Sequence, residues 1–165
     1  MHQNTRSAQS GSGDVLSAFV IAWLLAGTLD IATAIFYYVG PSGALAVTLL
    51  QGIASGLLGA QAFRGGLATA MLGLALHYLI ALIWTSVFFV VARGFKSLLR
   101  HLLPVGITYG VAVWFVMNLV VVPLSNARHA PIRLVPAIVG ATILVFCIGL
   151  PIALVLGRRL RDVSA

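Results

Sequence analysis

The chain has 165 residues, of which 61% are hydrophobic and 8% charged, and its mean hydropathy is +1.08. A water-soluble domain needs a far more polar surface, so this composition predicts an integral membrane protein with several apolar spans. The net charge of +7 does not indicate nucleic-acid binding, because the basic residues flank apolar segments and no combined basic and aromatic groove pattern occurs. Cys147 is the only cysteine, which excludes an intrachain disulfide.

The N-terminal region is predicted to be a polar tail followed by the first span. Residues 1–14 are rich in Ser, Gly and Gln, and we expect them to be disordered. The first span covers residues 15–39. The sequence Ala-Thr-Ala at 32–34 fits a signal-peptide cleavage site, but apolar character continues beyond it, which favours an uncleaved span. A turn is expected at the sequence GPSG, residues 40–43.

Residues 44–61 form an apolar segment that is short for a span. Thr48, Gln51 and Ser55 recur at spacings of three and four, which places them on one face of a helix. We therefore predict a short interfacial or re-entrant helix between the first and second spans. A fifth span over this segment remains the alternative.

Three further spans are predicted, over residues 67–92, 103–124 and 134–156, which gives a single transmembrane domain over residues 15–157. Residues 158–165 form a basic tail. With four spans, three basic residues fall on one side of the membrane, namely Arg64, Arg128 and Arg133. The other side holds seven, namely Arg6, Arg93, Lys96, Arg100, Arg158, Arg159 and Arg161. A fifth span would reduce this asymmetry to six against four, so the positive-inside rule favours four spans with both termini, and hence the basic tail, in the cytoplasm.

Four polar residues are expected deep inside the four spans, one in each. Asp30 is the only acidic residue in the body of the chain, which contains no Glu. At 1.5 Å per residue, Asp30 lies about 13 Å and His77 about 15 Å below the outer ends of their spans. Thr142 lies at about 12 Å and Asn118 at about 9 Å. The sequence therefore predicts one intramembrane polar cluster in the outer half of the bilayer.

Asp30 and His77 are expected to face each other inside the bundle. Small residues flank both of them, including Gly27 and Gly73, and such faces are typical of helix–helix contacts in lipid. A lipid-exposed Asp costs about 3 kcal/mol on insertion scales, which a histidine partner would offset. We therefore predict that the two side chains touch directly or through one water molecule.

This pair has two interpretations. It is either a polar clasp that fixes helix packing, or a proton- or cation-linked transport site, since intramembrane Asp and His are typical of proton relays. No metal or cofactor is expected, because Asp30, His77, Asn118 and Cys147 are too few and too mixed for a ligand set. No enzyme activity is expected either, because no serine lies convincingly beside the Asp and His.

The segments LLAGTLDIATAIFYY, LLQGIASGLLGAQAF, GLATAMLGLALHYLIALIWTSVFFVVAR and YGVAVWFVMNLVVVPLS resemble a group of small uncharacterised bacterial inner-membrane proteins. More distantly, the chain is similar to the YagU-type family. Asp30, His77 and Asn118 are the most distinctive points of this resemblance. It implies a bacterial inner membrane and a four-span fold, and it implies no activity.

The sequence therefore predicts an all-α integral membrane protein, a four-transmembrane-helix bundle with one short extra helix. The leading interpretation of its function is a non-enzymatic structural or accessory subunit. The alternative is a small proton-coupled transporter or channel that uses Asp30 and His77. The lipid bilayer is the expected partner, and a homodimer or a larger membrane complex stays open.

Overall fold

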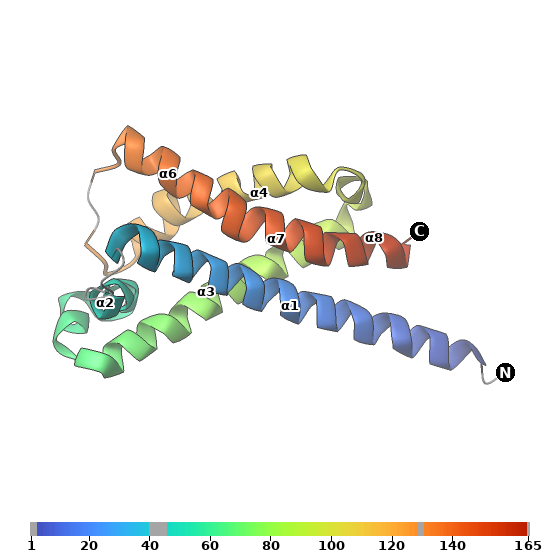
Figure 1. The fold of residues 1–165 in the computed structure, drawn as a ribbon, viewed down its shortest axis with the longest axis horizontal. Coiled ribbons are helices and arrows are strands. Elements are labelled where there is room, and N and C mark those ends of the chain that lie inside the picture. The colour runs from blue at the N-terminus through green and yellow to red at the C-terminus, as the bar shows by residue number, and fades with distance from the viewer. Residues whose placement is uncertain (1–2, 40–45, 129–130, 165) are drawn as a thin grey trace.

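Every element in the described part of the chain is a helix, as Figure 1 shows. The computed structural model describes residues 3–39, 46–128 and 131–164. The all-α class is therefore confirmed for these ranges. Five stretches in them are long and apolar enough to cross a bilayer, namely Gly13–Tyr37, Ala46–Arg64, Gly66–Gly94, Leu102–Leu124 and Leu134–Val163. The predicted turn at 40–43 lies outside the described residues.

The first helix, α1, runs from Gln3 to Val39 and differs from the sequence prediction at its start. Residues 3–14 were expected to be a disordered tail, but they continue the helix of the first span. Asp14 in this extension forms an ion pair with Arg159 near the C-terminus, which ties the extension to the last helix. The two ends of the chain therefore lie at the same end of the bundle (Figure 1).

The short segment after α1 contains α2 (Ala46–Leu58), which continues into the 3-10 helix η1 (Gly59–Arg64). Figure 1 looks nearly down the axis of α2, so α2 lies across the direction of the long helices. The predicted polar face of α2 is divided, because Thr48 is exposed whereas two of its residues point inward. Gln51 and Ser55 are buried, and Gln51 Nε2 donates to the carbonyl of Gly66 at 2.9 Å. That bond accounts for the inward orientation of Gln51, because a buried side-chain amide needs a hydrogen-bond partner inside the protein.

The next two long helices form a hairpin. The connection between them lies at the end of the bundle that holds the termini (Figure 1). Helix α3 spans Gly66–Gly94, and the 3-10 helix η2 (Lys96–Arg100) connects it to α4 (Leu102–Val116). Helix α4 continues through a π-helical segment, η3 (Met117–Val121), into α5 (Val122–Leu124).

The last long helix is a chain of short pieces: α6 (Leu134–Leu144), the π-helical η4 (Val145–Gly149), α7 (Leu150–Ile152), the π-helical η5 (Ala153–Gly157) and α8 (Arg158–Ser164). Pro151 lies in α7 between the two π-helical segments. Proline lacks an amide hydrogen, and wider turns on either side accommodate the missing bond.

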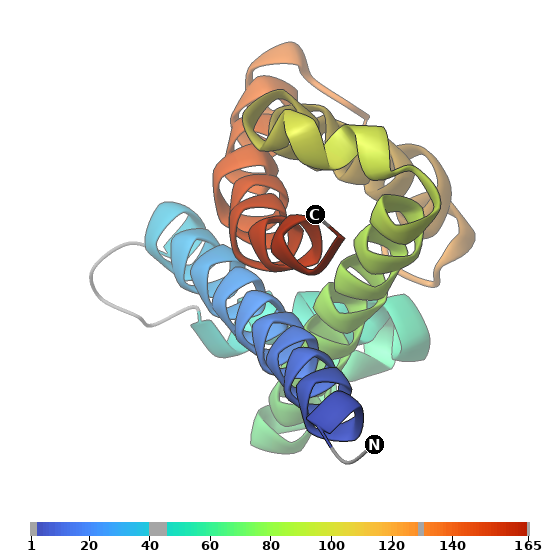
Figure 2. The same cartoon turned by 90° about the vertical axis from the view of Figure 1, so that its right-hand side faces the viewer.

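Small residues allow the long helices to approach closely. A Cβ atom on Gly149 would overlap the backbone of Gly106 and Gly110, so α4 and η4 touch through their main chains. The buried apolar core lies in the half of the bundle that holds the termini, and includes Phe88, Leu102, Ile152 and Leu156. Seen down the long axis (Figure 2), α1, α3, α4 and α6–α8 surround the bundle axis, and α2 lies crosswise behind them.

Candidate functional site

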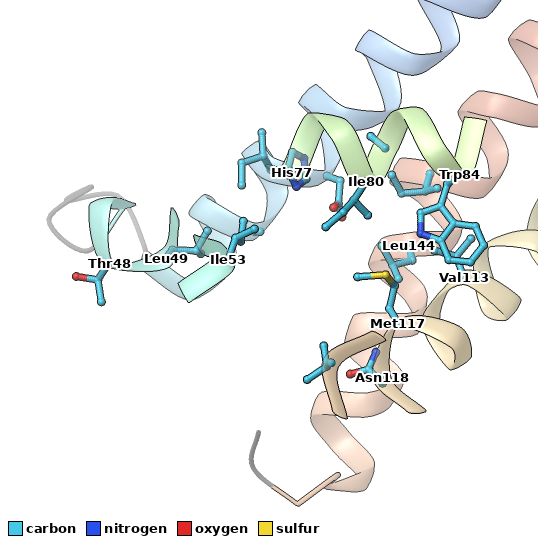
Figure 3. Close-up of a pocket in the computed structure, with 16 residues that line it drawn as sticks. Thr48, Leu49, Ile53, His77, Ile80, Trp84, Val113, Met117, Asn118 and Leu144 are labelled. Atoms are coloured by element: carbon cyan, nitrogen blue, oxygen red, sulfur yellow. The ribbon is translucent and has the colours of Figure 1, made fainter. Parts of the chain in front are cut away.

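The half of the bundle next to α2 contains a partly open cavity of about 610 Å³. Residues from α1, α2, α3, α4, η3, α5, α6 and η4 line it. Figure 3 shows His77 and Trp84 along α3 on one side, with Met117 and Asn118 across the cavity. Thr48, Leu49 and Ile53 of α2 border a third side (Figure 3). The wall is therefore mostly apolar with a few polar groups, as ligand sites commonly are.

A second cavity of about 520 Å³ adjoins the first, because Asp30, Ala34, Asn118 and Leu144 line both. Its other walls include Trp114 and the residues around the start of α6, among them Arg133. Arg133 is exposed. The second cavity therefore connects the surroundings of Asp30 to the end of the bundle that is opposite the termini.

Asp30 is the polar group that the two cavities share without any protein partner. Its side chain is half-buried, and it makes no hydrogen bond or ion pair with any described residue; the ion pairs in those ranges are Asp14–Arg159 and Arg161–Asp162. Buried carboxylates in proteins are nearly always paired. The carboxylate of Asp30 instead faces open space inside an apolar bundle.

His77 is buried, and its Nε2 lies 2.8 Å from the carbonyl oxygen of Gly27. A carbonyl oxygen can only accept a hydrogen bond, so Nε2 must carry the hydrogen. In the neutral ring, Nδ1 then holds the free lone pair. The same contact places His77 one helical turn from Asp30, because Gly27 precedes Asp30 by three residues.

The structure shows neither a hydrogen bond nor an ion pair between Asp30 and His77. No ion pair within 4.0 Å joins the two residues, and the hydrogen bond of His77 goes to the backbone of α1 instead. Both side chains nevertheless line the larger cavity and interact electrostatically. A bridging water remains the form that the predicted contact can take.

Of the two other predicted cluster residues, the structure brings one to the site. Asn118 lines both cavities, and its Nδ2 donates to the carbonyl of Trp114 at 2.9 Å in its own helix. Thr142 does not join the cluster. It is exposed and donates to the carbonyl of Ile138 at 2.8 Å. A threonine can satisfy its hydroxyl within its own helix, so depth in the bilayer does not require it to point inward.

The predicted cluster did not include two contributors to the site, Trp84 and Arg133. Trp84 follows His77 by two helical turns, so the sequence places it on the same face of α3 as His77, but it was not counted among the site residues. In the sequence, Arg133 was informative only about membrane topology, as one of the counted basic residues. Its place at the second cavity depends on how α6 packs against α1 and η3. Within the described ranges, no group of three or more His, Cys, Asp or Glu side chains is gathered as a metal site would need.

The arrangement is suited to moving a proton. With Nε2 fixed as a donor, Nδ1 of neutral His77 can accept a proton, and the carboxylate of Asp30 can do the same. A water molecule between them would let one proton be shared by both groups, with the cavities as its route to bulk water. Comparisons with protein-family models, curated proteins and solved structures gave no match to this chain.

Proposed function

We propose that this chain is a small proton-coupled transporter in which Asp30 is the group that gains and loses the proton. The observation that carries the proposal is that Asp30 has no protein partner among the described residues and borders two cavities. A carboxylate that served only as a structural clasp would be expected to bind a group on a neighbouring helix. One that must exchange protons needs access to water instead.

We further propose four membrane spans, with both termini in the cytoplasm of a bacterial inner membrane. Three features of the chain support this topology. Although Ala46–Arg64 is apolar enough to cross a bilayer, α2 lies across the direction of the long helices (Figure 1). The Asp14–Arg159 ion pair places the two ends of the chain side by side, which favours an even number of crossings. The positive-inside rule then assigns the more basic end to the cytoplasm.

The transporter is expected to work as a homodimer. The half of the bundle that holds the termini is filled by the apolar core, while the cavities occupy the other half. A pathway through the filled half would have to open between copies of the chain or by a movement of its helices.

A structural or accessory role is the second candidate, and the contact between α1 and α3 favours it. Trp23 Nε1 donates to the carbonyl of Tyr78 at 2.8 Å, and the hydroxyls of Thr28 and Tyr78 lie 2.9 Å apart. Together with the His77–Gly27 bond, these contacts fix the register of the two helices. They do not involve Asp30, so the behaviour of Asp30 distinguishes the two functions.

The test is labelling of the purified protein with a hydrophobic carbodiimide, which reacts with protonated carboxyl groups, followed by peptide mass spectrometry. We expect an adduct on Asp30 that decreases as the pH rises, and no adduct at that position in Asp30→Asn. Asp14 and Asp162 serve as internal controls for exposed carboxylates. Absence of an adduct on Asp30 at every pH would show a sealed carboxyl and would support the structural role.

Transport itself is tested in proteoliposomes that carry a pH gradient and an internal pH-sensitive dye. Addition of a mixture of small cellular solutes should release protons through the wild-type protein and not through Asp30→Asn. Equal responses from the two proteins would contradict the proposal.

A further inference from the structure

We infer that the larger cavity binds an amphiphilic organic cation, meaning an ammonium-like charge attached to an apolar body, with the charge held against Asp30. This inference rests on the proposed function and names the class of substrate that would exchange with the proton. Three features of the cavity carry it: the sign of its charge, the nature of its wall and its size.

The charge of the cavity is set by Asp30. His77 is the other titratable group that lines it, and its neutral form contributes no positive charge. Two further groups lie close by: Cys147 on η4, which interacts electrostatically with Asp30, and Arg133, which lines the second cavity and is exposed at its rim. An anion would therefore meet a carboxylate with no buried cation to receive it, whereas a cation would find an unpartnered counter-charge.

The wall of the cavity selects for an apolar body. Ile80, Met117, Leu144 and Ile148 line it, and Trp84 supplies an aromatic ring whose face attracts cations. A sugar or a phosphate ester would leave several of its own polar groups without partners here, which strongly disfavours binding. The volume of about 610 Å³ lies within the range typical of small-molecule sites.

Binding of the cation would release the shared proton. In the proposed empty site, the carboxyl of Asp30 holds one proton, which a water molecule would let it share with Nδ1 of His77. When the cation reaches Asp30, that proton leaves through the cavity to bulk water. One positive charge replaces another, so no buried charge is left unbalanced at either stage.

The probe is tetraphenylphosphonium, an apolar cation, and its matched control is tetraphenylborate, an anion of closely similar shape. Binding to the detergent-purified protein is measured by calorimetry in weak buffer, and released protons are followed with a pH electrode. We expect tetraphenylphosphonium to bind and to release up to one proton per site, and tetraphenylborate not to bind.

Variants then assign the binding to this cavity. Asp30→Asn should weaken tetraphenylphosphonium binding by about 100-fold, as expected when one partner of a buried charge pair is removed. Trp84→Leu should weaken it by about tenfold, and Trp84→Phe by less. Trp114→Leu is the control, because Trp114 lines the second cavity and not the first. It should leave the affinity unchanged.

If Asp30→Asn does not fold, the wild-type protein still tests whether the cation binds at Asp30, because bound tetraphenylphosphonium should protect Asp30 from the carbodiimide. Equal binding of the anion, undiminished binding by folded Asp30→Asn, or absence of protection would overturn the inference. Should Asp30 react with the carbodiimide in a pH-dependent way while no tetraphenylphosphonium binds, the substrate class is wrong and the proposed proton exchange stands.

Discussion

Asp30 differs from the other three residues of the predicted polar cluster, because each of those three has a hydrogen-bond partner on a helix backbone. His77 bonds to Gly27 on the neighbouring helix, whereas Asn118 and Thr142 bond to carbonyls of their own helices. A carboxylate cannot follow them when ionised, since a helix interior offers no free N–H group. The other side chains can donate to helix carbonyls, whereas an ionised carboxylate can only accept. Asp30 therefore lies beside a cavity and not against a helix backbone.

Gly27 is the residue on which the contact between α1 and α3 depends. A Cβ atom there would lie 2.9 Å from the ring of Tyr78, whose hydroxyl is itself held by Thr28. We expect Gly27→Ala to destabilise the protein by about 1–3 kcal/mol, the usual cost of overpacking. Gly52→Ala is the control, because a Cβ atom at Gly52 meets nothing within 4 Å and alanine favours helix. Thermal unfolding in detergent measures both, and equal melting temperatures would contradict the predicted contact.

At the scale of the elements, α2 is held at its place by bonds to two different parts of the chain. Gln51 binds the first turn of α3, and the backbone N–H of Asn126 donates to the carbonyl of Gly56 at 2.9 Å. A Cβ atom on Gly73 would overlap the backbone of Leu50, so α2 also lies directly against α3. These contacts fix α2 as a crosswise cover over the cavity.

The placement of α2 predicts which side of the membrane its end faces. Single cysteines are introduced as Gly13→Cys and Ala60→Cys in a Cys147→Ser background, since both positions are exposed. In intact cells an impermeant thiol reagent should label position 60 and not position 13, because in the proposed four-span topology α1 alone crosses the membrane between them. Ser97→Cys is the control and should behave like position 13. Labelling of positions 13 and 60 from the same side would show that α2 crosses the membrane.

At the scale of the whole molecule, the bundle is divided into a packed half and a hollow half. The packed half contains the apolar core and the basic residues of η2 and α8, while the hollow half contains the two cavities and α2. The glycine contact between α4 and η4 and the ion pair between Asp14 and Arg159 stabilise the first half. In the proposed transporter, solutes would reach Asp30 from the hollow half.

This division predicts the orientation of the chain. A reporter active only in the periplasm should be inactive when fused before Met1 or after Ala165, because the more basic end of the bundle is retained in the cytoplasm. The same reporter inserted after Arg128 should be active, which controls for expression. Activity at one terminus and not at the other would require an odd number of spans.

The sequence by itself determined the helical class, the presence of several helices apolar enough to cross a membrane, and the ionisable residues inside them, because length, hydropathy and the cost of a buried carboxylate are local properties. The depths predicted from the sequence placed Asp30, His77 and Asn118 in one layer, and all three line the larger cavity. The tertiary structure alone decided which of them have partners. Thr142 turned away because its own helix satisfies it, and His77 bound a backbone carbonyl because Gly27 lets α1 and α3 approach so closely. Arg133 lines the second cavity because α6 packs against α1 and η3, and no single stretch of sequence encodes that packing.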